Sequence, residues 1–189
     1  MTRTRWRTAL AVLTGLTALF TAHARADDWT LPVEVTYNQI RCIAYRARLS
    51  GAYLEVEAKI EPGWHTFAMD SAQRAAEKLA GRKSLSQDAP TEIGVTEGLI
   101  PEGPWYQTPP KDFSKPELRW FSWGFVDRVS FAVKAARAGA GPARVEVRGQ
   151  VCTESVCKKI DIVIGVPLGA SATDKAPSDI ILESLVPVR

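Results

Sequence analysis

The strongest constraint on the fold is an alternation of apolar and polar residues with a period of two. It runs through Tyr53–Ile60, Arg128–Lys134 and Ala143–Gly149, and it begins again at Lys159–Ile164 before that segment becomes more apolar. Successive side chains of an extended strand point to opposite faces, so this pattern predicts half-buried β-strands. Ser50 and Gly51 predict a hairpin turn between Ile43–Leu49 and Tyr53–Ile60.

One segment breaks the alternation. Residues 71–80 are rich in strong helix formers, with Asp70 and Gln73 placed as a capping pair and Gly81 placed to end the helix. Residues 84–116 contain six prolines and predict a long irregular connection, a kind of loop that is often functional. Many short strands, one helix and no alternation of strands with helices favour an all-β antiparallel sandwich and disfavour a thioredoxin fold.

The first 26 residues predict a secretory signal peptide. Three arginines precede an apolar run over residues 9–20, and Ala24-Arg25-Ala26 provides a small-x-small cleavage site. The apolar run is shorter than the roughly 20 residues that span a bilayer. We therefore expect export to the periplasm through the general secretory route, with no membrane insertion after cleavage.

Removal of this peptide changes the net charge. Residues 1–26 hold four of the 24 basic residues and none of the 21 acidic ones, which leaves a formal net charge of −1. This balance speaks against a nucleic-acid partner or a polybasic membrane surface. The chain is expected to divide into the signal peptide (1–26), one sandwich domain (27–167) and a C-terminal tail (168–189). The last apolar stretch of that tail, 180–182, is also compatible with a docked terminal segment.

Two cysteines lie close together in the segment Val151-Cys152-Thr153-Glu154-Ser155-Val156-Cys157. They can form a disulfide across a tight turn if their Cα atoms come within about 7 Å, and an oxidising compartment favours that bond. A structural disulfide that closes so short a loop contributes only about 2 kcal/mol to the stability of the fold. As a redox pair, it places both sulfurs where exchange is fast, with Lys158 and Lys159 favouring the Cys157 thiolate and Glu154 opposing it. The spacing alone leaves both functions open.

The remaining chemistry-bearing residues are few. Cys42 lies in a strand-like segment and is predicted to be a buried free thiol, or else a cysteine that forms a mixed disulfide with a partner. His65 follows Trp64 and is interpreted as a packed histidine. The cysteine pair together with His65 and Met69 would suit copper(I), but no spacing groups them. The sequence therefore predicts no metal and no cofactor, with copper handling kept as an alternative.

Residues 105–125 are rich in aromatic side chains. Ordinary core and loop packing explains such a stretch. It could also form an apolar cover over the cysteine pair, or a docking surface for a partner.

Three segments, Ile60–His65, Gly124–Val129 and Gly149–Cys157, resemble in order and spacing the N-terminal periplasmic domain of the thiol:disulfide interchange protein DsbD. The resemblance spans about residues 30–166. It implies an immunoglobulin-like antiparallel β-sandwich, here with one short inserted helix that does not match the family. It also implies that Cys152 and Cys157 are the redox-active pair, with Cys157 attacking, and that the pair receives electrons from a membrane thiol reductase and passes them to periplasmic thioredoxin-like proteins.

The resemblance further implies a cap loop that shields the cysteines. The family's cap falls somewhere within Phe113–Trp123 here, with Phe113, Trp120 and Phe121 as the candidates. Residues 27–189 hold neither a membrane domain nor a thioredoxin-like domain, so the electron donor is expected to be a separate protein. A non-catalytic binding module with a structural disulfide is the main alternative function.

Overall fold

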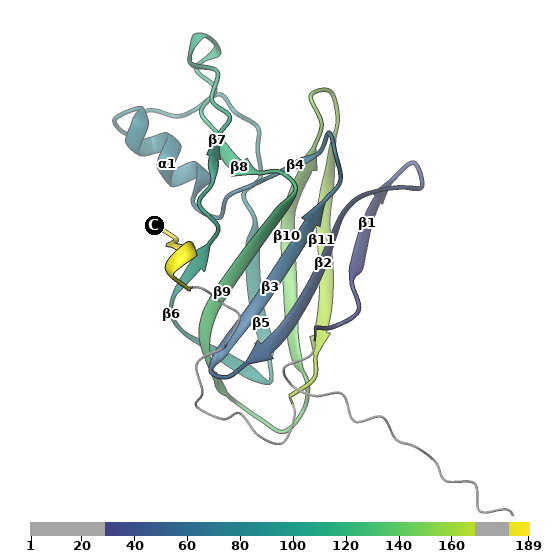
Figure 1. The fold of residues 1–189 in the computed structure, drawn as a ribbon. Coiled ribbons are helices and arrows are strands. Elements are labelled where there is room, and N and C mark those ends of the chain that lie inside the picture. Colours follow the sequence, from purple (N-terminus) through teal and green to yellow (C-terminus); the bar gives the residue numbers. More distant parts are fainter. Residues whose placement is uncertain (1–28, 169–181) are drawn as a thin grey trace, which may run out of the picture.

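The computed structural model describes residues 29–168 and 182–189 (Figure 1). The predicted signal peptide, residues 1–26, lies outside the described residues. Within the described ranges, no helix is both long and apolar enough to cross a membrane.

Two antiparallel sheets form the molecule. The first sheet contains, in spatial order, β1 (Val33–Tyr37), β2 (Ile40–Ser50), β3 (Tyr53–Ile60), β9 (Arg128–Arg137), β6 (Leu99–Gln107) and β12 (Val186–Pro187). The second contains β11 (Cys157–Val166), β10 (Ala143–Cys152), β4 (His65–Phe67), β8 (Trp123–Phe125) and β7 (Lys111–Asp112), and β5 (Glu92–Glu97) also pairs with β10. The described helices are α1 (Ser71–Lys78) and the 3₁₀ turns Pro116–Leu118 and Leu182–Ser184. The predicted all-β antiparallel sandwich with one inserted helix is confirmed.

The two sheets bury their facing sides, as the alternation predicts. In β10, Val145, Val147 and Val151 are fully buried, whereas Arg144 and Arg148 on the opposite face are exposed. Phe131 of β9 and Ile160 of β11 meet in the same core. Each such side chain contributes about 1.5–3 kcal/mol by leaving water, so the sequence pattern fixes which face of each strand points inward.

The predicted irregular connection over residues 84–116 is wrong in part, because it contains strands β5 and β6. Pro101 and Pro104 both lie within β6, and Pro104 falls where the pairing of β6 with β9 is interrupted, between Glu102 and Tyr106. Proline cannot donate a backbone hydrogen bond, so it is tolerated at such an irregularity. Between the two strands, Gly98 has φ +74°, and a Cβ there would collide with the carbonyl oxygen of Pro142.

Helix α1 begins at the predicted residue and ends two residues earlier than predicted. The predicted side-chain cap is wrong: Asp70 occupies the N-cap position but makes no capping hydrogen bond. At the other end, the Gly81 amide donates to the Ala76 carbonyl, 2.8 Å away, with φ +82° at Gly81. The left-handed residue directly after the C-cap is Ala80, with φ +50°, and its amide donates to the Glu77 carbonyl at 3.2 Å. The helix therefore ends in a Schellman motif, in which Gly81 is the residue after the left-handed closing position.

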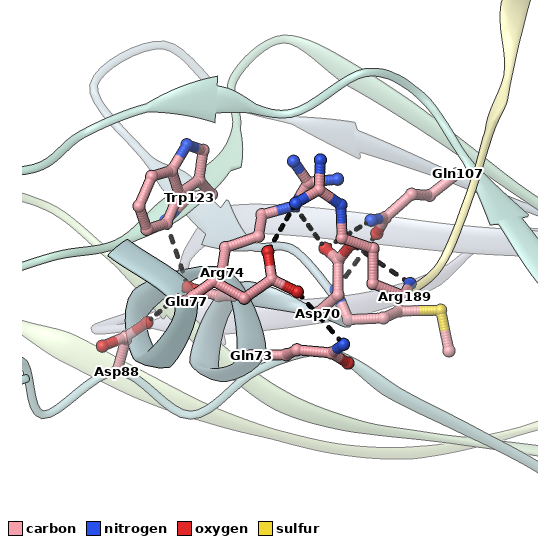
Figure 2. Close-up of polar contacts among 10 residues, drawn as sticks. Asp70, Gln73, Arg74, Glu77, Asp88, Gln107, Trp123 and Arg189 are labelled. Carbon is pink, nitrogen blue, oxygen red and sulfur yellow. Dashed lines mark hydrogen bonds and ion pairs between the residues drawn. The ribbon is translucent and has the colours of Figure 1, made fainter. Parts of the chain in front are cut away.

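The Asp70 carboxylate instead joins three parts of the fold (Figure 2). Its side chain is fully covered, and it accepts hydrogen bonds from Arg74 Nε (2.9 Å) and Gln107 Nε2 (2.7 Å). Gln107 in turn accepts from the Met69 amide through Oε1, and the Arg189 amide lies 3.4 Å from Asp70 Oδ2. Asp70 thus ties α1 to β6 and to the docked residues 182–189.

Replacing Asp70 by Asn should lower the free energy of unfolding by about 1–3 kcal/mol at pH 7, because charged hydrogen bonds are lost in a buried place. Burial disfavours the Asp70 charge, but the bonds from Arg74 and Gln107 outweigh it and lower the pKa of Asp70. A carboxyl group with a lowered pKa stabilises the fold above its unfolded pKa, near 4, and this stabilisation is lost as pH falls through the folded pKa.

Urea unfolding at pH 7 and at pH 3 measures the free energy of unfolding and its dependence on pH. The difference in this free energy between wild type and Asp70→Asn should be smaller at pH 3 than at pH 7. The control is Glu77→Gln, which removes the exposed ion pair with Arg189 and should cost no more than about 1 kcal/mol. Two results would contradict this account: an equal loss of unfolding free energy in Asp70→Asn and Glu77→Gln at pH 7, or a difference between wild type and Asp70→Asn that is the same at both pH values.

Candidate functional site: a disulfide in an open cleft

A disulfide joins the adjacent ends of β10 and β11. Cys152 lies directly opposite Cys157 in the strand register, and their Cα atoms are 4.0 Å apart. The four residues between them form a hairpin turn, in which the Thr153 amide donates to the Val156 carbonyl at 2.8 Å. Thr153 Oγ1 also accepts from the amides of Ser155 and Val156. The sulfurs therefore sit at the base of a short, hydrogen-bonded turn.

The disulfide lies on the outer face of the second sheet, the face that points away from the first sheet. Val151 points into the core, so Cys152, the next residue along the strand, points outward. On the other side of β10, Cys152 is paired with His65 of β4. Side chains directly opposite each other in antiparallel strands have Cβ atoms about 4.5–5.5 Å apart. Cys157, Cys152 and His65 thus form a row across three strands.

The two sulfur-bearing residues differ in access. Cys152 is only 2% exposed, whereas Cys157 is exposed. Thiol–disulfide exchange requires the attacking sulfur to reach the disulfide along an open path. Only Cys157 offers that path in this arrangement.

The exposed side of the disulfide opens into a cleft of about 680 Å³. Both cysteines, the turn between them and His65 form one wall. The remaining lining comes from the loop before β4, from β4 and β10 themselves, from the segment after α1, from the hairpin between β7 and β8 and from the turn after β8. These residues are Glu61–Trp64, Phe67, Gln87, Asp88, Phe113, Lys115, Trp120, Ser122, Val126, Asp127 and Gln150. Its size is typical of a pocket that takes a small molecule or one part of a larger partner.

The predicted cap segment, Phe113–Trp123, contains most of the β7–β8 hairpin. The strand pairing of β7 with β8 is extended by the Phe113 amide, which donates to the Ser122 carbonyl at 2.9 Å, and by a bridge between Lys115 and Trp120. Figure 1 shows this hairpin at the same end of the sandwich as the β10–β11 turn.

The structure separates the three predicted cap residues. Phe113 lines the cleft and contacts the His65 ring edge-on, with ring centroids 5.3 Å apart. Trp120 lines the cleft as well and is 38% exposed. Phe121 instead packs against Ala75 and Leu79 beneath α1. Two of the three aromatic side chains therefore share the cleft with the cysteines.

The sequence predicts a packed histidine at position 65, and the structure adds that His65 lines the cleft. Its ring packs edge-on against Phe67 and Phe113, with centroids 5.3 Å away in both cases. Burial lowers the pKa of His65, and the nearby Asp88 carboxylate partly offsets this effect. His65 is therefore neutral at pH 7 and able to accept a proton.

A network of hydroxyl groups holds Asp88 in the cleft. Its Oδ2 accepts from Ser71 Oγ of α1 (2.9 Å) and from Ser122 Oγ (3.2 Å). Ser71 Oγ in turn accepts from the Trp123 amide, 3.0 Å away (Figure 2). The next residue, Ala89, donates through its amide to Gln150 Oε1 at 3.1 Å. Helix α1, β8 and β10 together fix the position of this carboxylate.

The two lysines after Cys157 are directed elsewhere. Lys159 shares the face of Cys157 on β11, but its Nζ binds Asp161 Oδ2 at 2.9 Å. Lys158 lies on the opposite face of the strand because side chains alternate. The acidic Glu154 lines the cleft beside the disulfide.

The third cysteine does not line the cleft. Cys42 lies in β2 of the first sheet, is fully buried and is free, as predicted. Burial raises the pKa of its thiol, so it is a poor nucleophile. Across residues 29–168 and 182–189, no three His, Cys, Asp or Glu side chains are grouped so that they could hold a metal ion.

Comparisons with known proteins add little to this description. No family model matches the chain, and no curated protein matches it. Among solved structures, the reduced DsbD N-terminal domain of Neisseria meningitidis is similar with a TM-score of 0.44 and 12% identity, over 66% of this chain and 83% of that chain. The GAE domain of GGA2p from Saccharomyces cerevisiae is similar with a TM-score of 0.37 and 9% identity, over 72% and 98% of the two chains. Likenesses of this degree do not establish a function.

The difference in exposure predicts the order in which the reduced thiols react. After gentle reduction, iodoacetamide should modify Cys157 first, Cys152 more slowly, and Cys42 only after unfolding, because alkylation needs an accessible thiolate. Peptide mass spectrometry over time measures the three rates. Modification of Cys152 before Cys157, or of Cys42 in the folded protein, would show that the described arrangement is wrong.

Proposed function

We propose that this protein exchanges dithiols for disulfides with partner proteins through Cys152 and Cys157. The observation that carries the proposal is the asymmetric disulfide, which has one exposed and one buried member and borders an open cleft. A structural disulfide at this place would add little stability, because hydrogen bonds already pair β10 with β11 from Ala143 to Cys152. Closing so short a loop adds only about 2 kcal/mol.

The reaction runs in two exchange steps. In the reduced protein, the Cys157 thiolate attacks one sulfur of a partner disulfide, whose second sulfur leaves as a thiolate. The buried Cys152 thiol then loses its proton and attacks the Cys157 sulfur, which forms the Cys152–Cys157 disulfide and releases the other partner sulfur as a thiolate. Two electrons pass to the partner, and the two partner thiolates take up the two protons that the cysteines lose.

The partners proposed are thioredoxin-like proteins of the periplasm as acceptors and a membrane thiol reductase as donor. The support for this choice is the resemblance of the three sequence segments to the DsbD N-terminal domain, together with a signal-peptide pattern at residues 1–26. Phe113 and Trp120 are proposed to shield the disulfide from the side of the β7–β8 hairpin. Phe121 is left out of this role because it packs beneath α1.

Single cysteine variants test the exchange. Reduced wild type mixed with an oxidised thioredoxin-like protein should transfer both electrons, as measured by the free thiols gained by the acceptor. Cys152→Ser should stop at a mixed disulfide through Cys157, because nothing resolves it, and Cys157→Ser should form none. Cys42→Ala is the matched control and should exchange at the wild-type rate.

The rival function, a binding module with a structural disulfide, gives the opposite pattern. The variant that lacks both Cys152 and Cys157 would still bind the acceptor, and no mixed disulfide would accumulate in Cys152→Ser. That result would remove the exchange proposal.

A further inference from the structure

We infer that His65 is the proton acceptor for Cys152, the resolving thiol, and that the Asp88 carboxylate stabilises the imidazolium formed when His65 takes that proton. The inference rests on the proposed exchange function and assigns a role that the cysteines alone leave unfilled. A buried thiol is a poor nucleophile until its proton is removed, because the thiolate is the attacking species. Cys152 needs a nearby base, and the site offers a histidine on the neighbouring strand.

The strand register places this base beside Cys152. His65 is the direct cross-strand partner of Cys152, on the side of β10 opposite Cys157. All three side chains share the outer face and line one cleft. Among the described residues, neither ring nitrogen of His65 has a hydrogen-bond partner in the disulfide state, so a nitrogen is available for the thiol of Cys152 once the disulfide opens.

The surroundings keep the ring in place and neutral. Phe67 and Phe113 pack edge-on against it, which fixes its plane without using its nitrogens. Burial lowers the pKa of His65, so the imidazole is ready to accept a proton at pH 7. A group that accepts a proton from a thiol at neutral pH works best when it is neutral before the step.

Asp88 provides the compensating charge. Its carboxylate is held by Ser71 and Ser122 and favours the protonated form of His65. When Cys152 gives its proton to His65, the negative charge of Asp88 therefore stabilises the imidazolium that forms. The charged groups that line the cleft around His65 come from every neighbouring segment: Glu61, Asp88, Lys115, Asp127 and Glu154.

The step is balanced as follows. In the mixed disulfide between Cys157 and a partner, His65 takes the proton of the Cys152 thiol, and the Cys152 thiolate attacks the Cys157 sulfur. The bond between Cys157 and the partner breaks, and the electron pair leaves on the partner sulfur. The imidazolium then passes its proton to that leaving thiolate or to water, which returns His65 to its neutral form.

The test uses oxidised glutathione as the disulfide and follows the reduced protein by acid quench and mass spectrometry. Saturating glutathione isolates the resolution step, in which the glutathione adduct of Cys157 converts to the internal disulfide. A thiol with an ordinary pKa near 8.5 is about 3% thiolate at pH 7, so loss of the base should slow resolution by about tenfold to thirtyfold. His65→Phe preserves the ring contacts and His65→Gln preserves polarity, and both should show this loss.

The first step provides the internal control. Formation of the glutathione adduct on Cys157 should be unchanged in both His65 variants, because His65 lies beyond Cys152 on the other side of β10. The wild-type resolution rate should level off above the pKa of His65, whereas the rate of His65→Phe should rise about tenfold per pH unit up to about pH 8.5. A merely structural role for His65 would not produce this change of pH profile.

Two carboxylate variants test the second half of the inference. Asp88→Asn should slow resolution in the same direction as the His65 variants but less. Asp127→Asn removes an equal charge from another wall of the cleft and should leave resolution unchanged.

The failures are distinguishable. If wild type forms no glutathione adduct on Cys157, the proposed exchange function is wrong. If the adduct forms but resolves at the wild-type rate and with the wild-type pH profile in both His65 variants, the exchange function stands and the role of His65 is wrong. If Asp127→Asn slows resolution as much as Asp88→Asn, the special role of Asp88 is wrong.

Discussion

The register of β10 is the constraint on which the rest of the site depends. This strand is paired with β11 along one edge and with β5 and then β4 along the other. Gly149 lies where the neighbour changes, and a Cβ at this position would come within 3.0 Å of the Pro90 carbonyl oxygen. A slip of one residue would turn Cys152 into the core and Val151 out of it. Three pairings therefore secure the outward direction of the disulfide.

The cleft is assembled from segments that are far apart in the sequence. The β10–β11 turn supplies the sulfurs, β4 supplies the histidine, and the segment after α1 supplies the acid. These parts are joined by buried polar contacts, such as the bond from Thr66 Oγ1 to the Gln150 carbonyl at 2.8 Å. The inserted helix contributes through Ser71, which holds both the Asp88 carboxylate and the Trp123 amide. It thus belongs to the scaffold of the site, although Phe121 beneath it does not face the cleft.

Features that follow from local pattern could be predicted from the sequence. Alternation gave the strands of both sheets, and the short spacing of Cys152 and Cys157 allowed their disulfide. Strands β5 and β6 were missed because prolines such as Pro101 suppress a local strand signal that pairing with β9 restores. The place of His65 beside Cys152 does not follow from the sequence, because it comes from a long-range strand pairing. The sequence groups Trp120 with Phe121, but in the connection that leads into β8 Trp120 lines the cleft and Phe121 packs beneath α1. Only the fold decides which of them reaches the cleft.

The central claim is that the Cys152–Cys157 bond opens and closes under the conditions in which the protein works. Its reduction potential, obtained by equilibration with glutathione or dithiothreitol buffers and thiol trapping, measures this directly. The account predicts a value above about −300 mV, in the range of dithiols that exchange with thioredoxin-like proteins. A value well below about −300 mV would identify an inert structural bond and contradict the account.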